Sequence, residues 1–337
     1  MILSICIPTY NRVKHLDNCL NSLLIAKNNF PSFKFEVCIS DNNSKEDVKK
    51  IIQKYSNKFD LKYNKNPENL GFAINAIKTV SMASGEFSWL IGNDDLVTPD
   101  SFETLNSIIN SNLDKDYFYI NSYHMSSNFL EKFPKPLDTN NIGFDNLKTI
   151  SKIKKDKVVN FWDVIDNNVS WDFLIGIFVS IFRTKKWLSK VSTLNQKNIS
   201  DTGVWSTFEN TCLNAILITE SCKNSKAYIC SKPLSVNLSG EREWGEMYEF
   251  IEIVRIPELI DFYRSRGLSF VKYIYYKNYS LRNFSNYFFK IYFNSGKKGK
   301  HLINFNKHFL KNLIYPNVYI SIVFFIIRKL MKFLKLK

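Results

Sequence analysis

Residues 68–95 read ENLGFAINAIKTVSMASGEFSWLIGNDD, and this stretch decides the fold class of the chain. Gly71 opens a segment with helical spacing that we expect to run to Ala83. The apolar run 87–91 then predicts a short buried strand, which passes directly into the polar residues 93–95. In α/β sheets ligands bind at the carboxyl ends of the strands. The end of this strand is therefore the first place to look for a functional site.

The same alternation continues on both sides of this stretch. Short apolar runs predict further strands at 2–7, 35–40, 61–64 and 117–120. Helical spacing predicts helices at 13–27 and 45–55 and a further helix from Thr98-Pro99. Ser44 is the expected N-cap of the helix at 45–55, with Asp47 three residues later. Strands that alternate with helices predict an α/β fold with a doubly wound, mostly parallel sheet flanked by helices.

The second half of the chain is less regular. Residues 126–160 are polar and predict a loop or insert, and 175–182 predicts another strand. From Met247 onward the pattern is helical and basic. We therefore expect one domain at 1–245, made of halves 1–125 and 126–245, and a basic, aromatic helical region at 246–337.

Charge is distributed unevenly over the 337 residues, whose net charge is +15. Residues 262–337 hold 16 Lys and Arg and no acid, whereas the first 261 residues hold 30 bases and 31 acids. A neutral body with a basic end predicts an acidic partner surface, either nucleic acid or an anionic membrane. The overall composition is globular and excludes collagen-like or wholly disordered chains. The six cysteines include no CxxC and imply no disulfide framework.

The last residues resemble a membrane anchor more than a membrane span. Residues 318–327 are uninterrupted by charge or proline, but a spanning helix needs about 20 such residues. Residues 328–337 then alternate basic and apolar side chains, which favours an amphipathic helix on an anionic membrane. The alternative is a buried terminal helix with a solvated basic end. The first residues predict a strand and not a secretory signal, so we expect a cytoplasmic protein on the inner membrane face.

Three polar loops follow predicted strands and are expected to meet at one sheet edge. They are Pro8 to Arg12, Asp41 to Ser44 and Gly92 to Asp95. Adjacent carboxylates repel each other unless a cation or solvent screens them. Asp94 and Asp95 at a strand end therefore predict a site for Mg²⁺ or Mn²⁺, which binds through one or two carboxylates and substrate phosphates.

The ordered strings SICIPTYNR at 4–12, EVCISDNNS at 36–44 and the stretch 68–95 resemble family 2 glycosyltransferases, whose fold is called GT-A. The resemblance covers 1–125 well and 170–240 loosely. It is greatest to bacterial enzymes that build surface polysaccharide such as lipopolysaccharide O-antigen or capsule, abequosyltransferase-like members included. It implies transfer of a hexosyl or deoxyhexosyl group from a nucleotide-diphosphate sugar to a lipid-linked or growing glycan, with inversion and a divalent metal.

The resemblance also implies roles for individual residues. The nucleotide-binding turn holds Pro8, Tyr10 and Arg12, and Asp41 matches the acid that bonds the nucleobase. The wall of the donor pocket is matched by Asn69 and Gly71, and the acidic metal motif by Asn93, Asp94 and Asp95. Asp95 would ligate Mg²⁺ or Mn²⁺, and Asp94 would lie near the ribose or the sugar. The first position of the motif is Asn93 in place of the usual Asp.

The general base is expected in a short acidic motif of the second half. Asp201, in residues 199–205, is the best match, and Asp172 is the alternative. Asp201 could also be only a helix cap. Trp171 and Trp205 are candidates for stacking on sugar rings or for packing, and Arg242 for clamping phosphate or lying in a solvated loop.

Other functions are disfavoured by the same residues. A nucleotidyltransferase of similar fold would carry a Gly-rich, basic signature near the first strand, which PTYNR lacks. A nucleic-acid-binding protein could stack bases on the aromatic residues of the basic end. Aromatic residues this dense in a helical pattern are more typical of a core or a membrane interface, so we do not expect a nucleic-acid partner. A non-enzymatic scaffold would leave Asp94 and Asp95 without a role.

Overall fold

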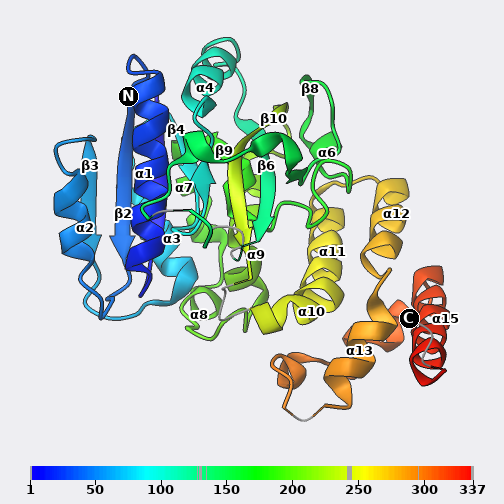
Figure 1. Cartoon of the computed structure of the whole chain (residues 1–337). Helices are drawn as coiled ribbons and strands as arrows, with labels where there is room; N and C mark the ends of the chain where they lie inside the picture. Colours follow the sequence, from blue (N-terminus) through cyan, green and yellow to red (C-terminus); the bar gives the residue numbers. More distant parts are fainter. Residues whose placement is uncertain are drawn as a thin grey trace. The chain divides into compact units, whose positions relative to one another are not determined.

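The computed structural model describes residues 2–126, 128, 131–133, 135–240, 245–294 and 296–334 (Figure 1). The chain divides into two compact units, Met1–Glu241 and Arg242–Lys337. The first unit is a sheet with helices on both faces, and the second is helical.

The sheet of the first unit has strands in the order β3-β2-β1-β4-β9-β6-β10-β5. Their bounds are β1 Leu3–Thr9, β2 Phe35–Asp41, β3 Leu61–Lys65, β4 Phe87–Leu90, β5 Leu96–Val97, β6 Tyr117–Ser126, β9 Ser180–Arg183 and β10 Lys226–Ser239. The short β7 Lys148–Thr149 pairs with β6, and β8 Lys157–Asn160 pairs with β10. β3, β2, β1 and β4 are all parallel, whereas β9 runs antiparallel to β4 and β6.

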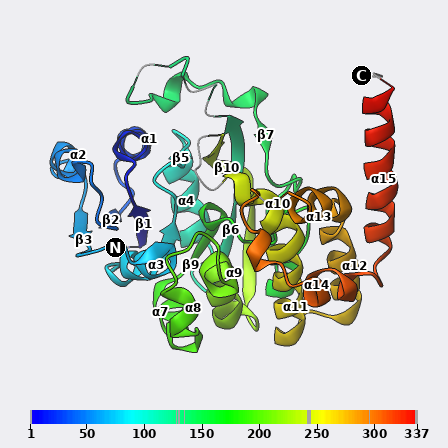
Figure 2. The same ribbon diagram turned by 90° about the horizontal axis from the view of Figure 1, so that it is seen from below.

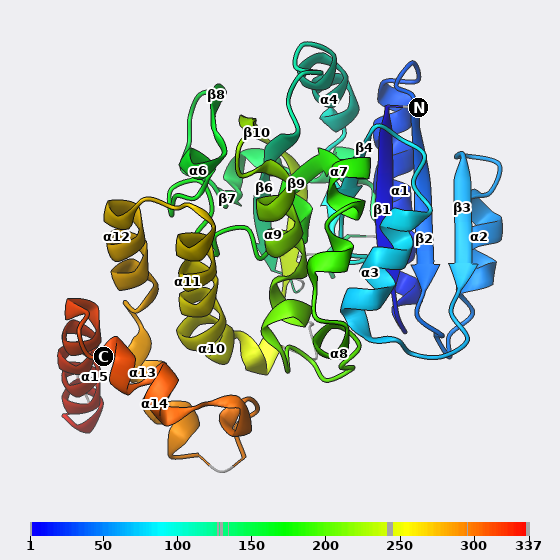
Figure 3. The same ribbon diagram turned by 180° about the vertical axis from the view of Figure 1, so that it is seen from behind.

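Helices cover both faces of this sheet, as the predicted doubly wound fold requires. α1 Val13–Asn29, α2 Val48–Tyr55 and α4 Ser101–Asn110 lie on one face, seen in Figure 1. α3 Gly71–Ser81, α7 Thr184–Leu188 and α9 Phe208–Cys222 lie on the other, seen in Figure 3. The short α6 Phe161–Val164 and α8 Gln196–Ile199 belong to the irregular second half. The predicted α/β class is confirmed.

Three local predictions were wrong for identifiable reasons. β10 was not predicted, because Pro233 interrupts its pattern, and the strand accommodates this proline at a register shift between Cys230 and Ser235. The strand predicted at 175–182 is shorter, because 177–179 forms a 3₁₀ turn before β9. Asp47, not Ser44, caps α2 by accepting from the Lys50 N–H at 3.2 Å, because the Ser44 hydroxyl accepts from the Asn11 N–H instead.

The second unit is helical, as predicted. Its helices are α10 Tyr248–Phe250, a π-helical turn at Ile251–Arg255, α11 Ile256–Arg266, α12 Phe270–Ser280, α13 Phe284–Tyr292, α14 Phe305–His308 and α15 Pro316–Phe333. α11 and α12 run side by side, which Figures 1 and 2 both show. No single helix among the described residues is long and apolar enough to cross a bilayer. Two segments bent by 94°, Phe305–Asn312 and Pro316–Met331, meet that length and composition only together.

Candidate active site

The ends of the parallel strands converge through hydrogen bonds between their loops. Thr9, at the end of β1, pairs in register with Asp41, at the end of β2. The Thr9 carbonyl accepts from the Asn42 N–H at 2.9 Å, and its hydroxyl accepts from the Asn93 side-chain amide at 2.7 Å. This bond ties the Asn93 side chain to the end of β1.

Two carboxylates converge at the turn that follows β4. A Cβ placed on Gly92 would lie 2.6 Å from Asp94 Oδ1 and 3.0 Å from Asp95 Oδ2. The Gly92 N–H donates to Asp95 Oδ2 at 2.7 Å, and the Asp95 N–H donates to the Gly92 carbonyl at 3.1 Å. The absence of a side chain at Gly92 therefore lets both acids face the same small volume.

The neighbours of these acids hold them in place. Arg12 donates to Asp94 Oδ2 at 3.2 Å, and Asn237 on β10 donates its amide N–H to Asp95 Oδ1 at 3.0 Å. Asp95 is only 2% exposed, so its charge is poorly solvated. Burial raises the pKa of the nearby Cys19 thiol, and the negative charges of Asp95 and Asp94 raise it further. Both carboxylates of the turn are thus close enough to act on a buried neighbour.

This donor set fits a divalent metal that arrives with a diphosphate. No group of three or more His, Cys, Asp or Glu that could hold a metal occurs in the described part of the chain. Mg²⁺ and Mn²⁺ prefer hard oxygen ligands and are commonly held by one or two carboxylates and substrate phosphates. The converging Asp94 and Asp95 supply two such carboxylates, so the residues fit a metal that is completed by its substrate.

Asp41 is fully buried at the end of β2. Its Oδ1 accepts from the Ser44 N–H at 2.8 Å and its Oδ2 from the Tyr63 hydroxyl at 3.1 Å. Burial and the adjacent Asp41 charge raise the pKa of Tyr63. Asp41 therefore fixes the loop after β2, and each of its oxygens retains one further acceptor position.

An asparagine network shapes the wall predicted around Asn69 and Gly71. Asn42 lies at its centre, where its amide N–H donates to Asn69 Oδ1 at 2.7 Å and its Oδ1 accepts from the Leu70 N–H at 2.9 Å. Asn69 Oδ1 also accepts from the Gly71 N–H at 3.0 Å. Asn66 extends the network to Asn42 at 3.2 Å. Because these amides are mutually paired, the loop before α3 has a single well-defined course.

Gly71 lies against the loop of Asp201, the predicted base. Its φ of +77° is in the left-handed region that favours glycine, and a Cβ there would lie 3.3 Å from the Asp201 carbonyl oxygen. The Asp201 carboxylate is exposed, and one of its oxygens accepts from the Gly203 N–H at 2.8 Å. Asn210, which caps α9 together with Thr207, donates to the Asp201 carbonyl at 3.1 Å. The loop of Asp201 is therefore anchored beside the donor wall, with its carboxylate accessible.

Asp172, the alternative base, has a different environment. Ser170 and the Leu174 N–H donate to its Oδ1, and the Gly176 N–H donates to its Oδ2 at 2.8 Å. Burial raises the pKa of Asp172, although these hydrogen bonds act in the opposite direction. The residues after it, Phe173 and Leu174, have φ of 54° and 75°. Three donors therefore hold the Asp172 carboxylate in a turn with two left-handed residues.

The remaining predicted residues are placed as follows. Pro8 is buried in β1, opposite Ser40, and Tyr10 is 41% exposed at the strand end. Trp171 is exposed beside Asp172, and Trp205 is half-buried in the Asp201 loop with φ of 54°. Arg242 lies outside the described residues.

Two residues of the site were not predicted. Asn42 lies within the string at 36–44, but its residue type alone does not predict the partners of its amide. Asn237 had no sequence signal, because its strand was missed and its partner Asp95 lies 142 residues away. A correct prediction of β10 as a strand would have placed Asn237 in the sheet.

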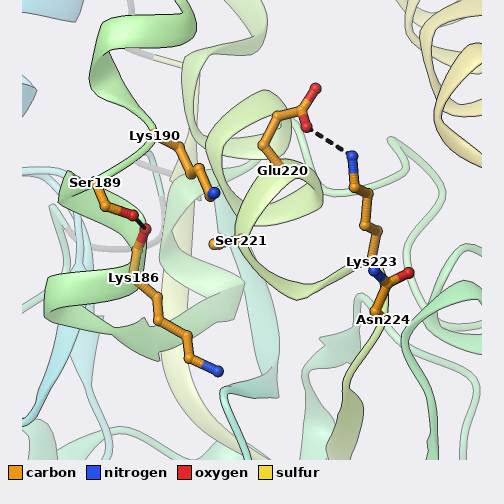
Figure 4. A pocket seen from close by; sticks show the side chains of 7 residues that line it. All are labelled: Lys186, Ser189, Lys190, Glu220, Ser221, Lys223 and Asn224. Carbon is orange, nitrogen blue, oxygen red and sulfur yellow. Dashed lines mark hydrogen bonds and ion pairs between the residues drawn. The ribbon is translucent and has the colours of Figure 1, made fainter.

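A separate surface pocket lies between α7 and α9 (Figure 4). It is lined by Lys186, Ser189, Lys190, Glu220, Ser221, Lys223 and Asn224. Lys186 pairs with Asp116 at 2.6 Å, and Lys223 pairs with Glu220 at 3.0 Å. None of the predicted site residues lines this pocket, so it is not part of the cluster at the strand ends.

The family model described as glycosyl transferase family 2 matches residues 4–187, which include the turn of Asp94 and Asp95. The chain belongs to glycosyl transferase family 2. The predicted family is thus confirmed. The abequosyltransferase RfbV of Salmonella typhimurium is 38% identical over 118 residues, which are 34% of this chain and 34% of that protein. The chain therefore spans about a third of the length of this relative.

Solved structures of glycosyltransferases share the fold of this family 2 chain. Staphylococcus aureus TarS 1–349 in complex with UDP-GlcNAc has a TM-score of 0.55 at 17% identity, covering 93% of this chain and 80% of that one. The mannosyltransferase PcManGT from Pyrobaculum calidifontis, in complex with GDP-Man and Mn²⁺, has a TM-score of 0.53 at 10% identity, covering 99% and 88%. At these identities the likeness establishes the fold, and the predicted GT-A fold is confirmed.

Proposed function

We propose that this family 2 chain transfers a hexosyl or deoxyhexosyl group from a nucleotide-diphosphate sugar to a growing or lipid-linked surface glycan. The observation that carries this proposal is the convergence of Asp94 and Asp95 over Gly92 at the ends of parallel strands. A diphosphate brings negative charge to a site that holds two carboxylates, and a divalent cation between them is the natural complement. The GDP-Man and Mn²⁺ bound by PcManGT support this pairing of nucleotide and metal.

Asp95 would hold the divalent metal, and Asp94 would lie beside it toward the donor. When bound, Mg²⁺ or Mn²⁺ neutralises the charge that develops on the departing nucleoside diphosphate. Asn237 orients the Asp95 carboxylate, and Arg12 balances Asp94. Asp41 and the asparagine network around Asn42 hold the loops that receive the nucleoside, because Asp41 and Asn42 are buried and internally paired.

Asp201 accepts the proton of the acceptor hydroxyl. Its carboxylate is exposed, and its loop touches the donor wall at Gly71. The hydroxyl oxygen forms the new bond to the anomeric carbon as the bond from that carbon to the diphosphate oxygen breaks. A single displacement of this kind inverts the anomeric configuration. Exposed aromatic rings at Tyr10 and Trp171 offer stacking surfaces for sugar rings.

The acceptor is a surface glycan of the kind suggested by the relatives. RfbV is named as an abequosyltransferase, and TarS is named as a poly(ribitol-phosphate) β-N-acetylglucosaminyltransferase. A chain that uses cytoplasmic nucleotide sugars and a lipid-linked glycan would work on the inner face of the cell membrane.

The test is thermal unfolding of the whole chain with a panel of nucleoside diphosphates and nucleotide sugars, with and without Mn²⁺. A ligand present at 100 times its Kd stabilises the folded state by about 2.7 kcal/mol, which raises Tm by roughly 5 °C or more. We expect a shift for one nucleobase that requires Mn²⁺, is absent in Asp95→Ala and persists in Asp114→Ala, which removes an acid that is 74% exposed. A shift of equal size in Asp95→Ala would contradict the proposal.

A further inference from the structure

The helix α15 has one face that is used within its own unit. Ser285 of α13 donates its N–H to Ser321 Oγ at 3.0 Å, and the Ser321 hydroxyl donates to Ser285 Oγ at 2.8 Å. The rings of Phe289 and Phe325 pack with their centroids 5.4 Å apart. Two serines facing each other allow the backbones of α13 and α15 to approach closely. This face of α15 is therefore fixed by α13.

The other side of α15 is apolar and exposed. Nine side chains here are 42% to 61% exposed. We call them the α15 apolar face: Tyr319, Ile320, Val323, Phe324, Ile326, Ile327, Leu330, Met331 and Leu334. They recur at helical spacing, so they lie along one side of the helix over its whole length. Scattered exposed apolar residues are ordinary, but a continuous exposed apolar strip marks an interaction surface.

The charge of the surrounding chain selects among partners. Residues 262–337 hold 16 Lys and Arg and no Asp or Glu. At about 100° per residue, the exposed Arg328 and Lys329 fall on opposite flanks of the α15 apolar face. A second copy of this chain would bring a second set of like charges to the same surface, which opposes association. An anionic bilayer complements these charges and accepts the apolar side chains.

We propose that the α15 apolar face docks the protein on an anionic phospholipid bilayer, with α15 lying in the plane of the interface. Basic side chains on both flanks of an exposed apolar face are the pattern of a helix that lies in the plane of the interface. Arg328 and Lys329 extend along either flank toward the phosphate groups while the apolar side chains enter the acyl region. This proposal does not depend on sugar transfer, and its test requires no substrate.

The test is co-sedimentation of the full chain with vesicles of phosphatidylglycerol and phosphatidylcholine mixed equally, and with vesicles of phosphatidylcholine alone. We expect binding to the mixed vesicles that weakens with salt, and little binding to the neutral ones. Val323→Ser with Ile327→Ser should weaken binding at least tenfold. The matched control is Leu113→Ser with Val158→Ser, which removes two apolar side chains of similar exposure, 44% and 45%, from the other unit. It should leave binding unchanged.

The charge contribution is tested by Arg328→Gln and Lys329→Gln. Each is expected to weaken binding to the mixed vesicles about fivefold, since a basic residue near an anionic leaflet contributes about that factor. Equal binding to both vesicle types, or equal loss in the control pair, would overturn the proposal. So would a concentration-dependent dimer in sedimentation velocity that Val323→Ser with Ile327→Ser abolishes, because a second copy would then cover the face. Thermal unfolding of each variant shows that it remains folded.

Discussion

The two units depart in opposite ways from the usual separation of polar and apolar residues. At the strand ends of the first unit polar side chains are buried, with Asp41 at 0%, Asn42 at 4% and Asp95 at 2% exposed. On α15 of the second unit apolar side chains are exposed, with Val323 at 55% and Leu330 at 54%. Buried polar groups and exposed apolar strips are the two observations that carry information about function. The first points to chemistry and the second to a partner.

The two regions are also held together in different ways. The polar cluster is stabilised by mutual hydrogen bonds, in which each residue satisfies its neighbours, as Asn42 does for Asn69 and Leu70. The side chains of the α15 apolar face do not hold the helix in its unit, because the opposite side of the helix packs on α13. Substitutions should therefore affect function and stability together in the first region, and partner binding alone in the second.

The largest effect is expected for the proposed base. Asp201→Asn should lower kcat about 10³-fold, since general base catalysis contributes roughly 10²- to 10⁴-fold, and should leave the donor Kd unchanged. Steady-state kinetics and calorimetric titration with the donor measure the two quantities. The matched variant Asp172→Asn should lower stability and keep kcat within a few-fold of the wild type. The reverse pattern would make Asp172 the base and would remove the Asp201 loop from the proposed mechanism.

Acid stability compares one buried carboxylate in each unit. Burial would raise the pKa of Glu36, but hydrogen bonds from Lys62, Ser4 and Ser84 lower it to about 2. Burial opposes ionisation of Glu258 in the same way, but partners on the second unit lower its pKa to about 2. These partners are His308, Arg255 and Lys307.

Because both folded-state pKa values lie below the ordinary value, the unfolded chain binds more protons between about pH 4.5 and pH 2. Each group therefore stabilises the fold fully above about pH 4.5, by about 3 kcal/mol, and loses this as pH falls toward 2. Urea unfolding at pH 7, 4 and 3 should show this loss, and Glu36→Gln and Glu258→Gln should each flatten it. An unchanged pH slope in Glu36→Gln would show that its ion pair with Lys62 is not formed in solution.

Breaking the asparagine network should lower the stability of the fold, whereas a substitution on the α15 apolar face should not. Asn42→Ala removes the acceptor of the Leu70 N–H and of the buried Asn66 amide, and an unsatisfied buried group costs about 1–3 kcal/mol. Val323→Ser changes an exposed side chain and should alter the free energy of unfolding by less than about 0.5 kcal/mol. Urea unfolding at pH 7 measures both. Similar losses for the two variants would erase the distinction between the regions.

The smallest effect is expected at the residue that orients Asp95. Asn237→Ala should weaken Mn²⁺-dependent donor binding about tenfold, as is typical when a partner of a metal ligand is removed. Titration with the nucleoside diphosphate at several Mn²⁺ concentrations separates the metal affinity from the nucleotide affinity. The control Asn121→Ala removes another buried amide, which donates to the Ser231 carbonyl at 2.7 Å, and should leave both affinities unchanged. Equal losses in the two variants would indicate only a general weakening of the sheet.

The sequence predicted those features of this site that depend on residues close together in the chain. Asp94 and Asp95 were found because carboxylates that directly follow an apolar strand have few structural explanations. Contacts between distant segments were not predicted, because they depend on packing that no local pattern encodes. Gly71 against Asp201 is one such contact, and Asn237 with Asp95 is another. The second was also missed because Pro233 interrupts the strand pattern of β10.

Competition between local partners explains the error at the second helix. Ser44 has the residue type and spacing of a helix cap, but its hydroxyl is engaged by the Asn11 N–H from the loop after β1. Asp47 then takes over the cap of α2. Ser44, which the sequence pattern assigned to a helix cap, therefore joins two loops of the site. Functional sites are where such departures from local sequence patterns are expected.

The most direct test of the central claim is a crystal structure of the whole chain with Mn²⁺ and the nucleoside diphosphate that gives the largest thermal shift. Anomalous scattering from manganese locates the ion independently of the interpretation of the nucleotide. We predict an anomalous peak between the Asp95 carboxylate and the diphosphate, with the nucleobase lodged against the loop of Asp41. A nucleotide bound elsewhere, or at this loop with no manganese beside Asp95, would contradict the assignment of the strand-end cluster as the donor site.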